Sequence, residues 1–373
     1  MKKAIPSIAQ LEQELLAESA IADMELPDVI QQDAGRTLTA TQVRHDVSAF
    51  ARALINVYGG WPFLPDAARR QVLVALRRIQ DNAHDNMTAG DLFDVLRPII
   101  AQFADCHMCI MLDKQQARTN KRKPGRDVGK NIAGDDVVKL EMRGNVAVIA
   151  IRTLRDYETY FKPLQAQVAD MLTRSAALVV DLRGNGGGSS RATDKLAYNL
   201  YGAHVPMAKK VYIRATPDAA VVHGRKHHPD WLTLNDGLGT ALWVDAGDNL
   251  CPVFESAQPG YRHPIYVLTD WRTMSSAEMF CTKIKPHPYV KFVGDNTRGG
   301  EVYGDVGHIY LPTSKIKFIF GCVYRELVQE NFETNGYAPD ILCDDGQDAF
   351  DVAMQDFATR QISMVNLHNK GKV

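Results

Sequence analysis

The stretch that most constrains this chain covers residues 176–188 and reads AALVVDLRGNGGG. Its first half is a continuous apolar run rich in β-branched residues, which is typical of a strand buried on both faces of a sheet. Its second half is a loop with four glycines among five residues. Glycine accepts backbone angles that are closed to other residues and lets a ligand approach the main chain. The loop can therefore present bare N–H groups to an anion.

Several kinds of loop have this composition, and the flanking sequence separates them. The plainest is a tight strand-to-helix turn without a ligand. A dinucleotide-binding loop needs an acidic residue roughly twenty positions further on for the ribose, but residues 203–206 read AHVP. A phosphate-binding P-loop needs a Lys-Ser or Lys-Thr pair, which does not follow here. The pattern favours a loop that stabilises an oxyanion formed during a reaction.

Length, charge and cysteine content narrow the class of protein. A chain of 373 residues can bury a large core, and we expect one large domain and a smaller one. The formal net charge of -1 argues against a general nucleic-acid or membrane partner. The N-terminus has lysines but no signal-peptide apolar stretch, so we expect a soluble cytoplasmic protein. Six cysteines are too few for a disulfide scaffold, which predicts reduced thiols.

The chain divides into five predicted segments. Residues 1–35 form a polar arm that packs loosely, 36–104 a helical bundle, 105–135 a connection ending in a solvated basic loop, 136–345 an α/β core, and 346–373 a C-terminal helix and tail. Helices are predicted from near residue 39 and over 66–82, 88–103, 157–172, 191–200 and 347–360, and strands over 137–140, 146–151, 176–181, 211–213, 265–269, 290–293, 308–311 and 317–324.

A second polar stretch follows the predicted strand over 264–269. It reads DWRTMSSAEMF over residues 270–280, and a helix is expected to begin at its serines. Taken alone, Ser275 is best explained as a helix cap. Together with the glycine loop it has a second meaning, because the ends of two parallel strands meet at the edge of a sheet where such folds bind ligands.

The motifs DLRGNGGG, TMSSAE and VGDNTRGG, in this order, resemble a peptidase family. This is the family of C-terminal processing (tail-specific) peptidases, tricorn protease and the modules of interphotoreceptor retinoid-binding protein. The resemblance spans about residues 40–345 and implies an α/β (α+β) fold, a ClpP/crotonase-like peptidase core with an N-terminal helical bundle. It also implies that Ser275 is the nucleophile, because the nucleophilic serine of the family stands three residues before a glutamate, here Glu278. Ser276 with Gly186 or Gly187 would then form the oxyanion hole.

The resemblance also bears on which base activates the serine. The Ser-Lys branch of the family carries its lysine in a T-x-G-K-G motif, where this chain reads TRGGE over 297–301. The tricorn-like branch uses a histidine, and the stretch FADCH implies that His107 is the base. Glu333 precedes a G-x-x-P-D motif, and the resemblance implies that it is the distal carboxylate that assists this histidine. Cys106 stands where tricorn has a bridging serine. Only about thirty residues separate His107 from the first core strand, too few for a PDZ domain.

We therefore expect a serine peptidase that acts on short or unfolded peptides, with no cofactor and no metal. We also expect Lys121, Arg122 and Lys123 to attract the terminal carboxylate of the peptide. A possible homo-oligomer is left open.

Two alternatives belong to other classes. One is a catalytically weak or inactive family member that binds peptides or apolar small ligands. The other is a thiol-dependent activity of Cys106 and Cys109, whose spacing also suits a metal or redox site. No second cysteine or histidine pair at ligand spacing accompanies them.

Overall fold

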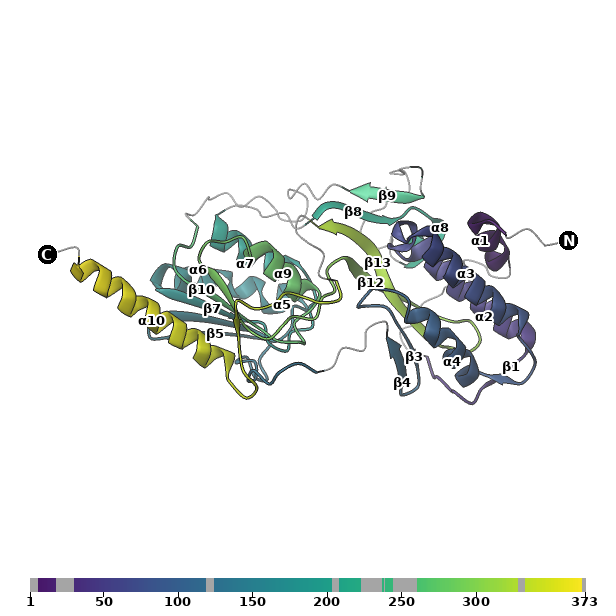
Figure 1. Ribbon diagram of the computed structural model, residues 1–373, viewed down its shortest axis with the longest axis horizontal. Helices are drawn as coiled ribbons and strands as arrows, with labels where there is room; N and C mark the ends of the chain where they lie inside the picture. The colour runs from purple at the N-terminus through teal and green to yellow at the C-terminus, as the bar shows by residue number, and fades with distance from the viewer. Residues whose placement is uncertain are drawn as a thin grey trace. The chain divides into compact units, whose positions relative to one another are not determined.

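Figure 1 presents a computed structural model, which describes residues 6–17, 30–118, 124–202, 208–222, 237, 239–243, 260–327 and 333–370. The chain forms two compact units. Unit 1 comprises Met1–Lys121, Ala208–Val244 and Val302–Glu326, and unit 2 comprises Arg122–Met207, Asp245–Glu301 and Leu327–Val373.

Unit 2 is built on a sheet with the strand order β14-β11-β10-β7-β6-β5. Its strands are β5 (Val138–Arg143), β6 (Val146–Ile151), β7 (Ala177–Asp181), β10 (Ile265–Thr269), β11 (Val290–Gly294) and β14 (Ile341–Leu342). All neighbours are parallel except β5 and β6. Each predicted strand of this group is confirmed to within about three residues.

Helices cover both faces of this sheet. On one face lie α7 (Arg191–Tyr201) and α9 (Ser276–Ile284), whose Leu196 and Phe280 share a core with Val180 of β7. On the other face α10 (Ala349–Lys370) packs through Ala353 against Val179. Because successive side chains of a strand point to opposite faces, β7 must be apolar throughout, as its sequence indicated.

The predicted single helix over 157–172 is wrong. The chain instead forms α5 (Tyr157–Tyr160), a 3₁₀ turn over Lys162–Leu164 and α6 (Gln165–Arg174). Pro163 sits in the 3₁₀ turn, and a proline in a helix interior removes a hydrogen bond and clashes with the preceding turn.

Unit 1 contains the predicted N-terminal helices. They are α1 (Ile8–Leu16), α2 (Ala40–Arg52), α3 (Asp66–Asp81) and α4 (Ala89–Ile100), with a π-helical turn over Ala53–Val57, a 3₁₀ turn over Trp61–Phe63, the short helix α8 (Pro217–Val222) and the strand pair β1 (Thr37–Leu38) and β2 (Met87–Thr88). Thr39 and Thr88 start α2 and α4 with capping boxes.

The N-terminal arm packs more tightly than its polarity predicts. Ser7 caps α1, and Leu11 and Leu15 are buried in the core of unit 1. A spacing of four residues puts both leucines on one helix face, which is enough to anchor a short helix. The expectation of loose packing is therefore wrong for residues 7–16.

The helices of unit 1 pack on an antiparallel sheet rather than on one another alone. This sheet has the order β4-β3-β13-β8-β9, and β12 pairs with β13. The strands are β3 (Cys109–Leu112), β4 (Gln115–Arg118), β8 (Ala208–Arg214), β9 (Thr240–Trp243), β12 (Tyr303–Tyr310) and β13 (Lys317–Leu327). Phe50 of α2 packs on Phe318 of β13 with ring centroids 4.3 Å apart.

The boundaries of the two units therefore differ from the predicted segments. The strands predicted over 211–213, 308–311 and 317–324 exist, but they belong to unit 1 and not to the α/β core. An assignment made along the sequence puts neighbouring elements in one domain, whereas this chain returns twice to the sheet of its first unit.

No helix in the described parts of the chain is both long and apolar enough to span a membrane.

The basic connection is partly anchored. Lys121, Arg122 and Lys123 lie outside the described residues. Further along, the Asn131 side chain donates to three carbonyl oxygens of unit 2, those of Ile151, Asp181 and Arg183, at 2.7–3.3 Å. The prediction of a solvated loop is therefore wrong for Val128 and for residues 131–133, whereas residues 124–127, 130, 134 and 135 are exposed.

Candidate active site

Ser275 occupies a strained turn between β10 and α9. Its backbone has φ 55° and ψ −128°, a combination that non-glycine residues rarely adopt and that costs on the order of 1–3 kcal/mol. A strained strand-to-helix turn of this kind pushes a serine side chain out of the fold. Such strain persists only where the surroundings hold it in place.

The Ser275 side chain is half-buried and does not cap the helix. Its hydroxyl makes no hydrogen bond to any residue that the structure describes. The explanation of Ser275 as a simple helix cap is therefore wrong, because a capping hydroxyl accepts a backbone N–H two or three residues on. The oxygen is available for chemistry.

The glycine loop and the Ser275 turn lie against each other. Leu268 of β10 pairs with Asp181 of β7, so both loops leave the sheet at the same edge, as predicted. The N–H of Met274 donates to the Asn185 carbonyl at 3.1 Å, and the Ser276 hydroxyl donates to the Gly188 carbonyl at 2.6 Å. These bonds fix the two loops as one structure.

Gly187 makes the closest approach to the serine. A Cβ atom at this position would lie 2.8 Å from the Ser275 Cβ, and its φ of +94° favours glycine. At Gly186, by contrast, a Cβ would meet nothing within 4 Å. Only the first of these glycines is required by packing.

Two backbone N–H groups beside Ser275 are candidates for an oxyanion hole. Those of Gly186 and Ser276 have no acceptor among the described residues, and Ser276 opens α9, where the helix dipole favours negative charge. The N–H of Gly187 donates to the Asn185 side-chain oxygen at 2.8 Å. Of the two glycines considered from sequence, the geometry favours Gly186.

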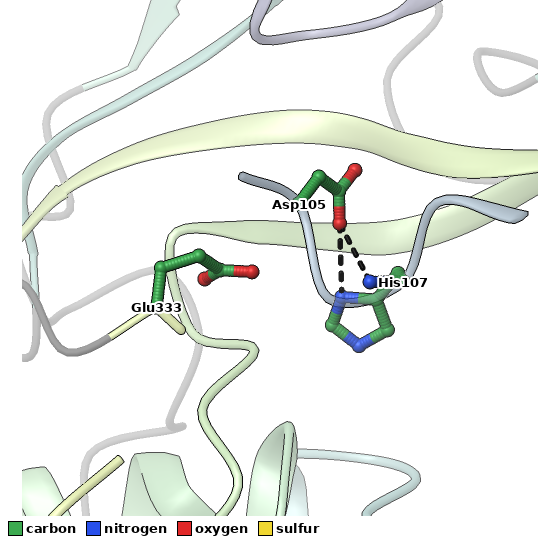
Figure 2. Close-up of side chains that lie close together, drawn as sticks. All are labelled: Asp105, His107 and Glu333. Carbon is green, nitrogen blue, oxygen red and sulfur yellow. Dashed lines mark hydrogen bonds and ion pairs between the residues drawn. The ribbon is translucent and has the colours of Figure 1, made fainter. Parts of the chain in front are cut away.

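His107 lies in unit 1, in the turn between α4 and β3, with its side chain only 9% exposed. Figure 2 shows its ring beside the carboxylate of Asp105, with 3.6 Å between Nδ1 and the nearer oxygen. The same oxygen accepts the backbone N–H of His107 at 2.7 Å, and the other accepts that of Gly321 at 3.1 Å. The fully buried carboxylate is thus fixed and faces the ring.

Of the other two predicted relay residues, Cys106 lies in unit 1 and Glu333 in unit 2, and the role of Glu333 stays a prediction. Cys106 is buried, and neither ring nitrogen of His107 makes a hydrogen bond within the described part of the chain, so the thiol does not bind the ring. Glu333 belongs to unit 2, where it is 4% exposed and its carbonyl accepts the Gly300 N–H at 3.1 Å. Asp105 lies in the stretch FADCH, but our sequence analysis assigned it no role.

The matched sequence now places the chain in a family. Residues 145–343 match the model of peptidase family S41, which is more than half of the chain. The chain belongs to peptidase family S41. The match contains Gly186, Ser275 and Glu333, and it begins after His107. A comparison with curated proteins found no match.

Solved structures share the fold of this S41 chain. A candidate peptidase from Parabacteroides merdae is 17% identical with a TM-score of 0.58, and the alignment covers 84% of this chain and 95% of that one. Mature CPAF is 14% identical with a TM-score of 0.50, over 81% and 92% of the two chains. These likenesses confirm a mixed α/β fold with N-terminal helices and an S41-like core. The tricorn protease is 16% identical with a TM-score of 0.34, and the alignment covers 58% of this chain and 18% of that one.

Proposed function

We propose that this chain is a serine peptidase that cleaves short or unfolded peptides through an acyl-enzyme on Ser275. One observation carries the proposal. Among the described residues the Ser275 hydroxyl makes no hydrogen bond and the neighbouring N–H groups of Gly186 and Ser276 have no acceptor, and Ser275 sits on a strained turn. This arrangement suits attack on a carbonyl whose oxygen becomes negative in the transition state. Membership of family S41 supports it independently.

The chemistry follows the ordinary serine logic. A serine hydroxyl is a poor nucleophile near neutral pH until a base takes its proton, and we assign that role to His107. The Ser275 oxygen bonds to the peptide carbonyl carbon, and the two N–H groups stabilise the oxyanion. His107 then returns the proton to the departing amine. Water, deprotonated by the same histidine, hydrolyses the ester and restores Ser275.

Asp105 is the group we assign to orient His107. A carboxylate facing one ring nitrogen fixes the tautomer that leaves the other nitrogen free to accept a proton, and it stabilises the imidazolium that forms. The support is the 3.6 Å separation between Nδ1 and Oδ1. The alternative relay through Cys106 and Glu333 is implied by the family resemblance.

A fluorophosphonate probe tests the assignment. We expect the folded wild-type protein and Ser276→Ala to be labelled, because the alanine keeps the backbone N–H, and Ser275→Ala to remain unlabelled. Cleavage of a peptide library by the labelled and unlabelled forms then identifies the bonds that are cut. Folded wild-type protein that takes no label would instead favour the ligand-binding alternative.

A further inference from the structure

The conformation of Ser275 needs an external support, because the turn cannot hold it alone. Serine followed three residues later by glutamate is the sequence of a capping box, in which the serine hydroxyl and the glutamate carboxylate each accept a backbone N–H of the same helix end. Neither bond forms here. The Ser275 N–H donates instead to the Gly299 carbonyl at 3.2 Å, and the serine side chain makes no cap.

Glu278 supplies the missing part of this arrangement. Its carboxylate is fully buried, and one oxygen accepts the Gly299 N–H at 2.9 Å and the Thr297 hydroxyl. Its own backbone N–H donates to the Ser275 carbonyl at 2.8 Å. Ser275, Gly299 and Glu278 therefore form a closed ring of three hydrogen bonds.

The ring is fixed on its far side as well. The Thr297 hydroxyl oxygen accepts the Tyr337 N–H at 2.6 Å, and the Arg298 N–H donates to the Thr273 carbonyl at 2.8 Å. Gly299 has a φ of +99°, a backbone conformation that favours glycine. The segment that carries the Gly299 peptide is thus bonded to Thr273, which precedes the serine turn in the chain, and to Tyr337, which follows it.

We propose that Glu278 is a positioning residue that holds the strained backbone of Ser275 through Gly299, and with it the adjacent N–H of Ser276. This inference rests on the proposed function of Ser275. Glu278 touches neither the hydroxyl nor the reacting atoms in the proposed reaction. Without its carboxylate the Gly299 peptide is released, the turn relaxes towards an ordinary helix start, and the hydroxyl becomes free to cap α9.

The chain offers a matched control. Glu301 is a second buried carboxylate, 1% exposed, and it bonds the Thr282 hydroxyl and the Tyr337 hydroxyl rather than the Gly299 peptide. Replacing Glu301 by glutamine therefore perturbs a buried network of the same unit without opening the ring. Glu278→Gln keeps an oxygen that can accept the Gly299 N–H, whereas Glu278→Ala removes it.

The test compares the rate of fluorophosphonate labelling, kcat and KM on a cleaved peptide, and thermal unfolding of the full chain. We expect Glu278→Ala to lower the labelling rate and kcat about 100-fold with little change in KM, and Glu278→Gln about tenfold or less. Glu301→Gln should stay within about threefold of wild type. Amide hydrogen exchange at Ser275 and Gly299 should accelerate in Glu278→Ala, which reports the ring independently of activity.

The outcomes separate this inference from the proposed function. Wild-type protein that is not labelled would overturn both. Labelled wild type together with an equally fast Glu278→Ala would overturn the inference alone, as would equal losses in Glu278→Ala and Glu301→Gln. If Glu278→Ala does not fold, Glu278→Gln decides. A fall in kcat well beyond tenfold in Glu278→Gln, with unchanged exchange at Ser275 and Gly299, then contradicts the ring.

Discussion

The turn at Ser275 in unit 2 and the turn at His107 in unit 1 are held in opposite ways. Ser275 is fixed by backbone bonds to Gly299 and Glu278 and by close packing of Gly187. The His107 ring makes no hydrogen bond among the described residues and faces the Asp105 carboxylate at 3.6 Å. The backbone of the nucleophile is held by several bonds, whereas the ring of the base is oriented by a charge.

This difference has a chemical reason. An oxyanion hole works because its donors are already in place and need no reorganisation when charge develops, so rigidity favours it. A general base must bind a proton and release it within each cycle, and it needs an orienting charge more than a fixed cage. Variants of the Ser275 turn and variants of the His107 turn should therefore lose activity for different reasons.

The largest expected effect is at the base. His107→Ala should lower kcat/KM by about 10⁴-fold or more, because no other group in the proposed mechanism accepts the serine proton. Steady-state hydrolysis of a cleaved peptide measures this loss, with circular dichroism confirming the fold. Activity within tenfold of wild type would remove His107 from the mechanism.

Variants of Asp105 and of Cys106 should differ in kcat. Asp105→Asn should lower kcat about 10³-fold, because an amide does not stabilise the imidazolium and favours the wrong tautomer. Cys106→Ala should stay within about threefold, because its thiol does not bond the ring. The measurement is kcat for both variants at several pH values.

A larger loss of kcat in Cys106→Ala than in Asp105→Asn would favour the relay through Cys106.

Thiol alkylation provides a related control for the thiol-dependent alternative. Burial raises the pKa of Cys281, and the nearby carboxylate of Glu278 raises it further, so this thiol should not react at neutral pH. Loss of activity on alkylation of wild type but not of Cys106→Ala would identify Cys106 as the sensitive group.

The two glycines of the loop provide the third comparison. Gly187→Ala should lower kcat about 100-fold, because the new methyl group would strike the Ser275 Cβ and the backbone has a φ of +94°. Gly186→Ala should be nearly neutral, because its site is open and alanine keeps the N–H. Labelling rates of the two variants measure the difference, and equal losses would contradict the packing argument.

The local patterns of the chain predicted its elements well because they depend on short-range physics. The apolar run before Asp181 predicted a strand buried on both faces, and the stripe from Val43 to Phe50 predicted α2. The pairing of the glycine loop with Ser275 also followed from the rule that parallel strands end at one edge. The family resemblance added Ser275 as the nucleophile.

What the sequence missed depends on contacts between distant segments. No local pattern shows that β8 and β13 return to the sheet of unit 1, because strand pairing is set by the whole fold. The roles of Asp105 and Gly299 likewise appear only when their neighbours are known. The bond from Gly187 to Asn185 could be suspected from the Asn in the loop, but its direction could not.

The smallest expected effect on catalysis concerns Lys283, the first lysine that follows Ser275 in the sequence. It lies on α9 and is paired with Asp194 of α7 at 3.1 Å, with both side chains at most 5% exposed. A lysine held in a buried ion pair is poorly placed to accept a proton. Lys283→Met should therefore cost about 3–5 kcal/mol of stability by leaving a buried carboxylate unpaired, while kcat of the folded fraction changes little.

The double variant Lys283→Met, Asp194→Leu sharpens this last comparison. Removing both charges replaces the pair by apolar side chains between α7 and α9, and much of the lost stability should return. Thermal unfolding and kcat measured on the same samples separate packing from chemistry. A fall in kcat of about 10⁴-fold in the folded double variant would mean that Lys283, and not His107, activates the serine.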